Sequence, residues 1–297
     1  MLITFTNPHI NLFFQYLQFE KRYSEHTIIS YKTDILQFQD FCITSFEVDD
    51  ITTANAAIVR SWLVQLKEND ISSKSINRKI STLKSFYKYL QKQKVVNDNP
   101  LSREISPKVP KRLPNFVEEK DINTLFEHVE FTDDFESQTK RLVLLLFYNT
   151  GIRLSELINL QIGQIDESYK QIKVLGKGNK ERIIPVNQIL LNDIKKVIAQ
   201  RPETNVNNVF VTEKGKALQP RYVYGFVKQY LSLVTTIKKK SPHVLRHSFA
   251  THLMNNGAEL NAVKELLGHS SLAATQVYTH NTIEKLKEVF AKAHPKA

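Results

Sequence analysis

Apolar side chains recur at helical spacing throughout the first hundred residues of the chain. In the clearest stretch they are three or four residues apart, at Ile76, Ile80, Leu83, Phe86 and Leu90, as on one face of an α-helix. The pattern predicts four helices, at Pro8–Glu20, His26–Thr44, Thr53–Asn69 and Ser75–Val95. All eight glycines lie at or beyond Gly151, so this part needs few turns with a positive φ. The N-terminal part is therefore expected to be all-α.

The rest of the chain predicts helices around one small antiparallel sheet. Two β-prone runs, Gln171–Leu175 and Arg182–Val186, flank Gly176-Lys177-Gly178-Asn179, which is typical of a hairpin. Val209–Val211 is a candidate for a further strand. Helices are expected at Tyr222–Leu231, after Pro242 and at Thr282–His294. The predicted fold class is mainly α, with an all-α N-terminal domain and an α-rich C-terminal domain that carries the sheet.

A proline-rich basic segment separates the two parts. Four of the ten prolines fall close together, at Pro100, Pro107, Pro110 and Pro114. The basic residues between them are Arg103, Lys108, Lys111 and Arg112. This composition predicts a stiff, extended linker that can follow a phosphate backbone. We therefore expect domains at residues 1–100 and 116–297, joined by a linker at 101–115.

Charge and cysteine content narrow the class of protein. The 41 Lys and Arg residues exceed the 30 Asp and Glu residues, for a formal net charge of +11, which suits a polyanionic partner. Cys42 is the only cysteine, so an intrachain disulfide is excluded and a reducing compartment is expected. The longest apolar run, Leu142–Tyr148, is far too short to span a bilayer. No signal-type segment begins the chain, so a cytoplasmic location without membrane contact is expected.

Several basic residues are candidate contacts to that polyanion. Arg78, Lys84 and Lys88 lie off the apolar face of the 75–95 helix, where they form either a DNA-facing stripe or a merely solvated face. Arg221 precedes the 222–231 helix, where it can reach a phosphate or a base edge. In the linker, Lys108 and Lys111 are candidates of the same kind.

Six residues form a set suited to breaking a phosphodiester: Arg153, Lys177, His243, Arg246, His269 and Tyr278. His243 and Arg246 share one face of a helix that starts after Pro242. Gly268 is a helix-stop signal that holds His269 in the break before the helix of Tyr278. Neither a carboxylate pair nor a Cys/His cluster accompanies the set, so no metal is expected. The sequence also lacks a Walker-type loop, and a transesterification needs no ATP.

Each residue type has a role in such chemistry. Tyrosine is a nucleophile, although its hydroxyl is weak at a pKa near ~10. Guanidinium groups bind two phosphoryl oxygens and stay protonated, so they absorb charge in the transition state. A lysine in a glycine-flanked loop can protonate the leaving 5′ oxygen as general acid. Histidines can donate hydrogen bonds to the phosphate or shuttle the proton of the nucleophile.

Taken singly, each residue also has an ordinary structural interpretation. A tyrosine in a helix usually packs, as we expect of Tyr148, Tyr222, Tyr224 and Tyr230. Arg153 can be a local ion-pair partner of Glu156. Lys180 competes with Lys177 for the general-acid role, or contacts the DNA backbone. The conjunction of six suitable residue types favours the catalytic interpretation over these alternatives.

The runs TGIRLSEL, VLGKGNKERIIPV, SPHVLRHSFATHL and LLGHSSLAATQVYTH, with the ending HPKA, resemble the tyrosine recombinases, and the Xer subgroup in particular. The resemblance covers essentially the whole chain. It implies a helical core-binding domain of SAM-like type followed by a catalytic domain. By motif, Arg153 and Arg246 match the phosphate-binding arginines and Lys177 the hairpin lysine. His243 and His269 match the two histidine positions, Tyr278 matches the nucleophile, and Glu156 matches a structural acidic position.

The resemblance implies site-specific recombination of double-stranded DNA through a covalent 3′-phosphotyrosine, without metal or ATP. Xer relatives resolve bacterial chromosome dimers at cell division. A homo- or hetero-tetramer on DNA is implied, with a second Xer-type recombinase or a DNA translocase as possible partners. A phage or mobile-element integrase with the same chemistry is the nearer alternative, and a non-catalytic DNA-binding protein the more distant one.

Overall fold

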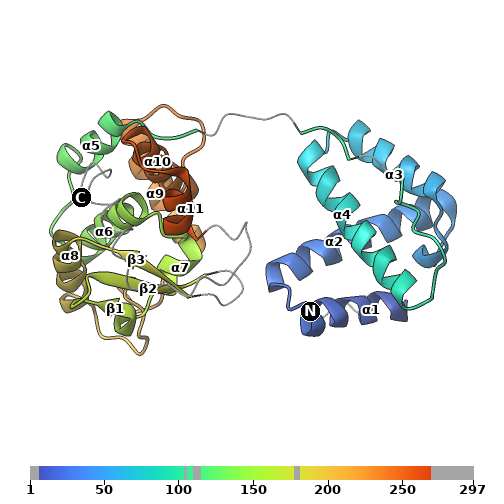
Figure 1. Ribbon diagram of the computed structural model, residues 1–297, viewed down its shortest axis with the longest axis horizontal. Helices are drawn as coiled ribbons and strands as arrows, with labels where there is room; N and C mark the ends of the chain where they lie inside the picture. The colour runs from blue at the N-terminus through green and yellow to red at the C-terminus, as the bar shows by residue number, and fades with distance from the viewer. Residues whose placement is uncertain (1–6, 104–105, 110–114, 177–180, 269–297) are drawn as a thin grey trace. The chain divides into compact units, whose positions relative to one another are not determined.

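The computed structural model describes residues 7–103, 106–109, 115–176 and 181–268. The chain divides into two compact units, Met1–Arg112 and Leu113–Ala297 (Figure 1). Among the helices that the structure describes, none is long and apolar enough to cross a membrane. The mainly α fold class predicted from the sequence is confirmed.

The N-terminal unit is built from helices, as predicted. Its elements are α1 (Pro8–Gln15), continued by the π-helical turn Tyr16–Glu20, α2 (Glu25–Phe46), the 3₁₀ turn Ile51–Thr53, α3 (Ala56–Glu68) and α4 (Ser73–Lys92). The side chains of Ser24, Asn55 and Ser72 each accept a backbone N–H in the first turn of the helix that follows, which satisfies donors that a helix start leaves free. Polar caps therefore set where these helices begin.

Aromatic side chains fill the core of this unit. Phe13, Phe38, Trp62, Phe86 and Tyr87 are almost completely buried, and the rings of Phe38 and Trp62 lie 5.0 Å apart. The apolar stripe predicted on α4 supplies much of this core. Cys42 is also part of this core, and burial raises the pKa of its thiol to about 12.

The C-terminal unit packs helices around an almost fully buried helix, α6. Its helices are α5 (Glu119–Glu127), α6 (Phe135–Thr150), α7 (Leu154–Ile158), α8 (Gln188–Ala199), α9 (Pro220–Val234), α10 (Pro242–Asn255) and α11 (Leu260–Leu267). Every residue of α6 from Leu142 to Thr150 is buried. α6 contacts both α8 and α10, and α10 contacts α11. Because the end of α6 leads directly into Arg153, this buried helix fixes the position of the first predicted site arginine.

The small antiparallel sheet of the C-terminal unit is confirmed. Its strands are β1 (Ile165–Asp166), β2 (Gln171–Leu175) and β3 (Glu181–Pro185), in the order β1-β2-β3. Ile172 pairs with Ile184 across the β2–β3 hairpin. The strand expected at Val209–Val211 does not form, because Val211 makes only an isolated bridge to Ala217.

Candidate active site

Arg153 is fixed by a short structured turn between α6 and α7. Gly151 ends α6 in the left-handed region, with φ of 58°, and Arg153 is the N-cap of α7. The backbone N–H of Arg153 donates to Glu156 Oε2 at 2.8 Å, and its Nη1 donates to Oε1 at 2.7 Å. The local ion pair considered for these two residues exists. The arginine also has a second partner, because its Nη2 donates to the carbonyl of Gly268 at 2.6 Å.

Arg246 approaches the same place from α10. Its side chain is buried, with 8% of the residue exposed. Nη1 donates to the carbonyl of Gly151, and Nη2 donates to the carbonyl of Leu267 at 2.6 Å. A Cβ on Gly151 would lie 2.6 Å from the ring of Phe249, so this turn requires glycine for space as well as for its φ.

A third arginine, Arg182 on β3, completes the cluster and was not singled out from the sequence. Its Nη2 donates to Glu156 Oε2 at 2.7 Å and its Nε to Oε1 at 3.4 Å. Its Nη1 donates to the carbonyl of Leu266 at 2.5 Å. Arg182 stands two residues before the buried Ile184 on β3, so the two side chains share the buried face of the strand. This in-phase placement is the signal by which the sequence could have revealed it.

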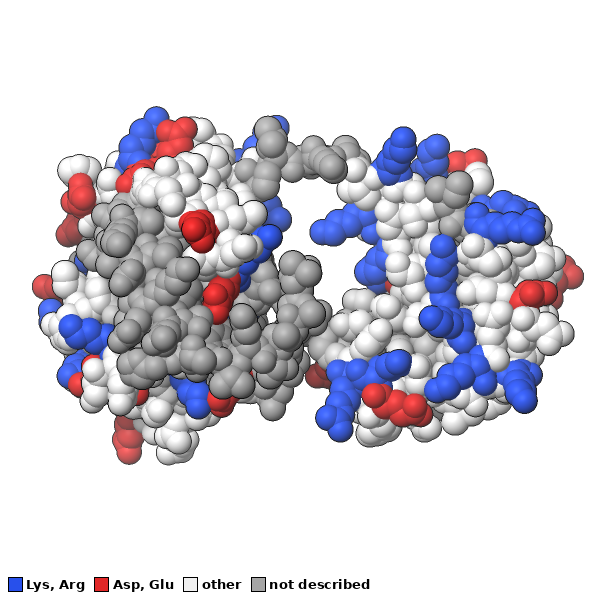
Figure 2. Space-filling view, viewed as in Figure 1, with Lys and Arg blue, Asp and Glu red and all other residues white. Residues whose placement is uncertain are grey.

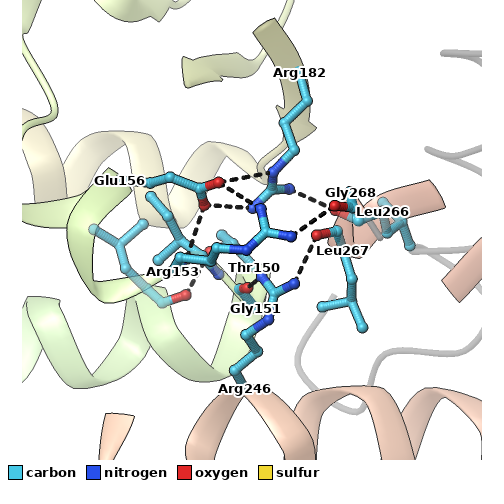
Figure 3. A network of polar contacts seen from close by, with 11 residues as sticks. Thr150, Gly151, Arg153, Glu156, Arg182, Arg246, Leu266, Leu267 and Gly268 are labelled. Carbon is cyan, nitrogen blue, oxygen red and sulfur yellow. Dashed lines mark hydrogen bonds and ion pairs between the residues drawn. The ribbon is translucent and has the colours of Figure 1, made fainter. Parts of the chain in front are cut away.

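The three guanidinium groups meet at the C-terminal end of α11 (Figure 3). Arg182, Arg246 and Arg153 bond the carbonyls of three consecutive residues, Leu266, Leu267 and Gly268. The last carbonyls of a helix have no intrahelical partner and carry the negative end of its dipole. Gly268 ends the helix in the left-handed region, with φ of 60°, as the predicted helix stop requires. The site is therefore organised around the point where the chain leaves α11.

The charges of the cluster do not cancel. Three guanidinium groups surround one carboxylate, so Arg153, Arg182, Glu156 and Arg246 together carry two positive charges in excess. Burial alone would raise the pKa of Glu156, but the hydrogen bond and charge of Arg182, with smaller contributions from Arg153, lower it. Burial and the two neighbouring arginines lower the pKa of Arg246 to about 9, so it stays protonated at neutral pH. An anion such as a phosphodiester would balance the excess charge.

His243 lies in the first turn of α10, three residues before Arg246. The residue is exposed, and partial desolvation, with the positive charges of Lys239 and Arg246, lowers its pKa, which favours the neutral ring at neutral pH. His252, on the same helix, is buried with Nδ1 3.0 Å from the hydroxyl of Tyr148. Burial lowers the pKa of His252 as well.

Lys177, His269 and Tyr278 lie outside the described residues, as do Lys111 and Lys180. Arg221 is the second residue of α9 and is exposed. Lys108 is exposed, next to Pro107, whose carbonyl accepts a hydrogen bond from Asn77 Nδ2 at 2.9 Å. The structure thus brings Arg153, Arg246 and the α11 end together, with His243 in the first turn of the same helix as Arg246.

The candidate DNA stripe on α4 has a buried polar support. Lysine and arginine side chains are spread over the visible face of the N-terminal unit (Figure 2). Arg78, with a side chain 42% exposed, donates from Nη1 to the buried Asp34 at 2.6 Å. Lys79, almost fully buried, pairs with the other Asp34 oxygen at 3.0 Å. Lys84 is half-buried and Lys88 exposed. Arg78 differs from Lys84 and Lys88 in that a buried carboxylate fixes its side chain. Because Lys79 already balances the charge of that carboxylate, the positive charge of Arg78 is left in excess.

No group of three His, Cys, Asp or Glu side chains that could hold a metal ion occurs in the described part of the chain. Glu156 is the carboxylate of the arginine cluster, and both its oxygens accept hydrogen bonds from arginines. The donor set on these elements is cationic, which suits an oxyanion and not a metal ion.

The chain matches two family models, the "Phage integrase family" over residues 115–285 and the "Phage integrase, N-terminal SAM-like domain" over residues 10–94. It is 38% identical over 298 residues to a tyrosine recombinase XerC of Anoxybacillus flavithermus, covering 98% of this chain and 99% of the relative. It is 36% identical to a XerC of Chlorobaculum parvum, covering 96% of this chain and 94% of the relative. Its fold resembles the XerH site-specific recombinase bound to a palindromic difH substrate, with a TM-score of 0.71, 22% identity and coverage of 88% and 78% of the two chains.

Proposed function

The chain belongs to the phage integrase family and is a site-specific tyrosine recombinase, and we propose that Arg153 and Arg246 hold the scissile phosphate of its DNA substrate. The observation that carries the proposal is the excess of two positive charges at the end of α11. Arginines in a partly buried site stabilise a phosphoryl transition state strongly, because little water competes for their hydrogen bonds. These arginines are pre-organised, since Glu156 and backbone carbonyls already fix their planes.

The remaining residues act in the step that breaks the DNA strand. The hydroxyl oxygen of Tyr278 attacks the phosphorus, and a new phosphorus–oxygen bond forms as the bond to the 5′ oxygen breaks. Lys177 gives the leaving 5′ oxygen its proton as general acid. His243, favoured in its neutral form, and His269 hydrogen-bond the phosphate or carry the proton of the tyrosine. The DNA is left joined through a 3′-phosphotyrosine, which the 5′ hydroxyl of another strand attacks to rejoin it.

The cellular role we propose is resolution of chromosome dimers at cell division. The nearly full-length similarity to tyrosine recombinases named XerC supports it. Recombining two duplexes breaks four strands, so four active sites are needed, and we propose a tetramer on the DNA, with or without a second Xer-type recombinase. Arg78, Lys84, Lys88, Lys108, Lys111, Lys180 and Arg221 are the proposed DNA contacts. A DNA translocase is a further proposed partner, as activator of strand exchange.

Sequencing the DNA that is covalently attached to the protein in cells tests the function and the role together. Cells carrying the tagged parent or Tyr278→Phe are lysed in denaturant, and DNA that stays attached is recovered. One chromosomal site in the parent sample, absent from Tyr278→Phe, is the expected result. Recovery of the ends of a mobile element would replace the chromosomal role with integration. Recovery of no attached DNA, from a protein that still binds DNA, would contradict the enzymatic proposal.

A further inference from the structure

Arg182 has the guanidinium that the protein encloses most fully among the three arginines. Its side chain is 5% exposed, and Nε, Nη1 and Nη2 each donate to an oxygen of the protein. Arg153 differs, since its side chain is 26% exposed. Each nitrogen of the Arg182 guanidinium thus already donates to the protein, which suits a supporting residue better than a direct phosphate contact.

The partners of Arg182 join three separate parts of the site. The bidentate contact with Glu156 reaches α7, where the same carboxylate holds the guanidinium and the backbone N–H of Arg153. The contact with the Leu266 carbonyl reaches the end of α11. Arg182 itself stands on β3, one residue after the strand begins. One buried side chain therefore connects the hairpin strand, the helix start of Arg153 and the end of α11 (Figure 3).

Gly268 gives an independent sign that the chain is shaped around Arg182. A Cβ at Gly268 would lie 2.6 Å from Cδ of Arg182 and 3.1 Å from its Nε. The arginine side chain thus crosses the α11 end at a distance that only glycine allows. The φ of 60° at this residue favours glycine for a second reason. The helix end and the arginine are fitted to each other.

From these contacts, we propose that Arg182 is a positioning residue of the recombination reaction, which acts through Glu156 to aim Arg153 at the scissile phosphate. This inference rests on the proposed function. Loss of Arg182 leaves Glu156 with one arginine partner, so the carboxylate that orients the Arg153 guanidinium loses its second anchor. A displacement of about 1 Å in a catalytic group lowers the rate by about 10²-fold. The rate loss is therefore expected only where the scissile phosphate carries the negative charge that Arg153 binds, and not for attack on an uncharged phosphorus centre.

The test uses single-turnover formation of the covalent adduct on a duplex nicked beside the scissile phosphate. The duplex carries the site recovered from cells. In a second version of the duplex, a methyl group replaces one non-bridging oxygen of the scissile phosphate, which removes the charge that the arginines bind. Arg182→Gln is expected to cleave the ordinary duplex about 10²-fold more slowly and the methylphosphonate duplex at nearly the parental rate. An equal loss on both duplexes, or no loss on either, would overturn the inference.

Arg182→Lys covers the case in which Arg182→Gln does not fold. It keeps the charge, but one ammonium group cannot reproduce the bidentate contact and also reach Leu266, so the same selective loss is expected in weaker form. Glu156→Gln combined with Arg182→Lys should be little worse than the more damaging single variant, because both act on one arginine. If the rate losses of the two single variants instead added up in the double variant, Arg182 and Glu156 would not act through the same arginine, and the inference would fail.

A matched control removes an arginine that shares none of these partners. Arg201 donates from Nη2 to the carbonyl of Val206 at 2.8 Å, and Arg201→Gln is expected to leave the ratio of the two cleavage rates unchanged. A shifted ratio in this control would overturn the assignment of the effect to Arg182. If the parent protein itself forms no Tyr278-linked adduct, the proposed function fails. If the parent forms it and the ratio does not move in Arg182→Gln or Arg182→Lys, only the positioning role fails.

Discussion

Replacing Gly268 by alanine tests how tightly the end of α11 is fitted to Arg182. The alanine must keep a left-handed conformation, φ of 60°, which costs about 1–2 kcal/mol. Its Cβ would also lie 2.6 Å from Cδ of Arg182, the middle of a buried side chain that cannot move without weakening its contact with Glu156. Overpacking of this kind costs about 1–3 kcal/mol. We therefore expect Gly268→Ala to lower the free energy of unfolding by about 2–5 kcal/mol.

Gly257 offers a matched control in the same unit. It follows α10 with φ of 88°, and apart from its chain neighbours no atom of the described residues lies within 4 Å of its Cβ position, so Gly257→Ala carries only the backbone cost of about 1–2 kcal/mol. A unit of 185 residues loses about 2–4 °C of Tm per kcal/mol. Calorimetry of the full chain is expected to place the Gly268→Ala midpoint several degrees below that of Gly257→Ala. The sole tryptophan, Trp62, reports on the N-terminal unit and helps to assign the transitions. Equal midpoints would refute the close packing of Arg182 on Gly268.

Two further predictions follow from the proposed chemistry, and a third from the burial of His252. Lys177→Ala should cleave ordinary DNA about 10²–10⁴-fold more slowly and recover much of its rate when sulfur replaces the scissile 5′ oxygen; rescue of Lys180→Ala alone would exchange the roles of the two lysines. Strand cleavage at low salt should survive excess EDTA, since arginines carry the phosphate charge; a loss restored by Mg²⁺ at unchanged DNA binding would contradict this. Burial lowers the pKa of His252 below its ordinary 6.5, so the unfolded chain takes up more protons there. Stability, measured by urea unfolding, should therefore fall as pH drops below 6.5, and fall less in His252→Phe; an identical pH dependence in both proteins would argue against this contribution.

The helices and the hairpin could be predicted because their signals are local. The apolar stripe of α4 and the cap residues Ser24 and Ser72 are visible in the sequence, and both helix starts fall within two residues of the expected positions. β1 was missed because two residues are too few to show an alternating pattern. The strand expected at Val209–Val211 was wrong because a buried apolar run does not require a continuous partner strand.

The support of the site was much harder to predict than the site itself. In the sequence, Arg182 is typical of a solvated hairpin residue, and only its spacing of two from Ile184 indicates that it faces the core. Its partner Glu156 is 26 positions away. Asp34 and Lys79 are a similar pair, 45 positions apart, and both stand in phase with apolar neighbours on their helices. Charged residues on a core-facing stripe indicate that a partner exists, but only the fold shows which residue it is.

Covalent attachment of the Tyr278 hydroxyl to DNA defines the proposed reaction, and it can be detected without measuring recombination. The parent and Tyr278→Phe are incubated with the nicked duplex, denatured and separated by size, and the attached peptide is identified by mass spectrometry. Removing one hydroxyl should leave DNA binding intact, so we expect a Tyr278-linked adduct for the parent and none for Tyr278→Phe. An undiminished adduct in Tyr278→Phe would show that another residue is the nucleophile.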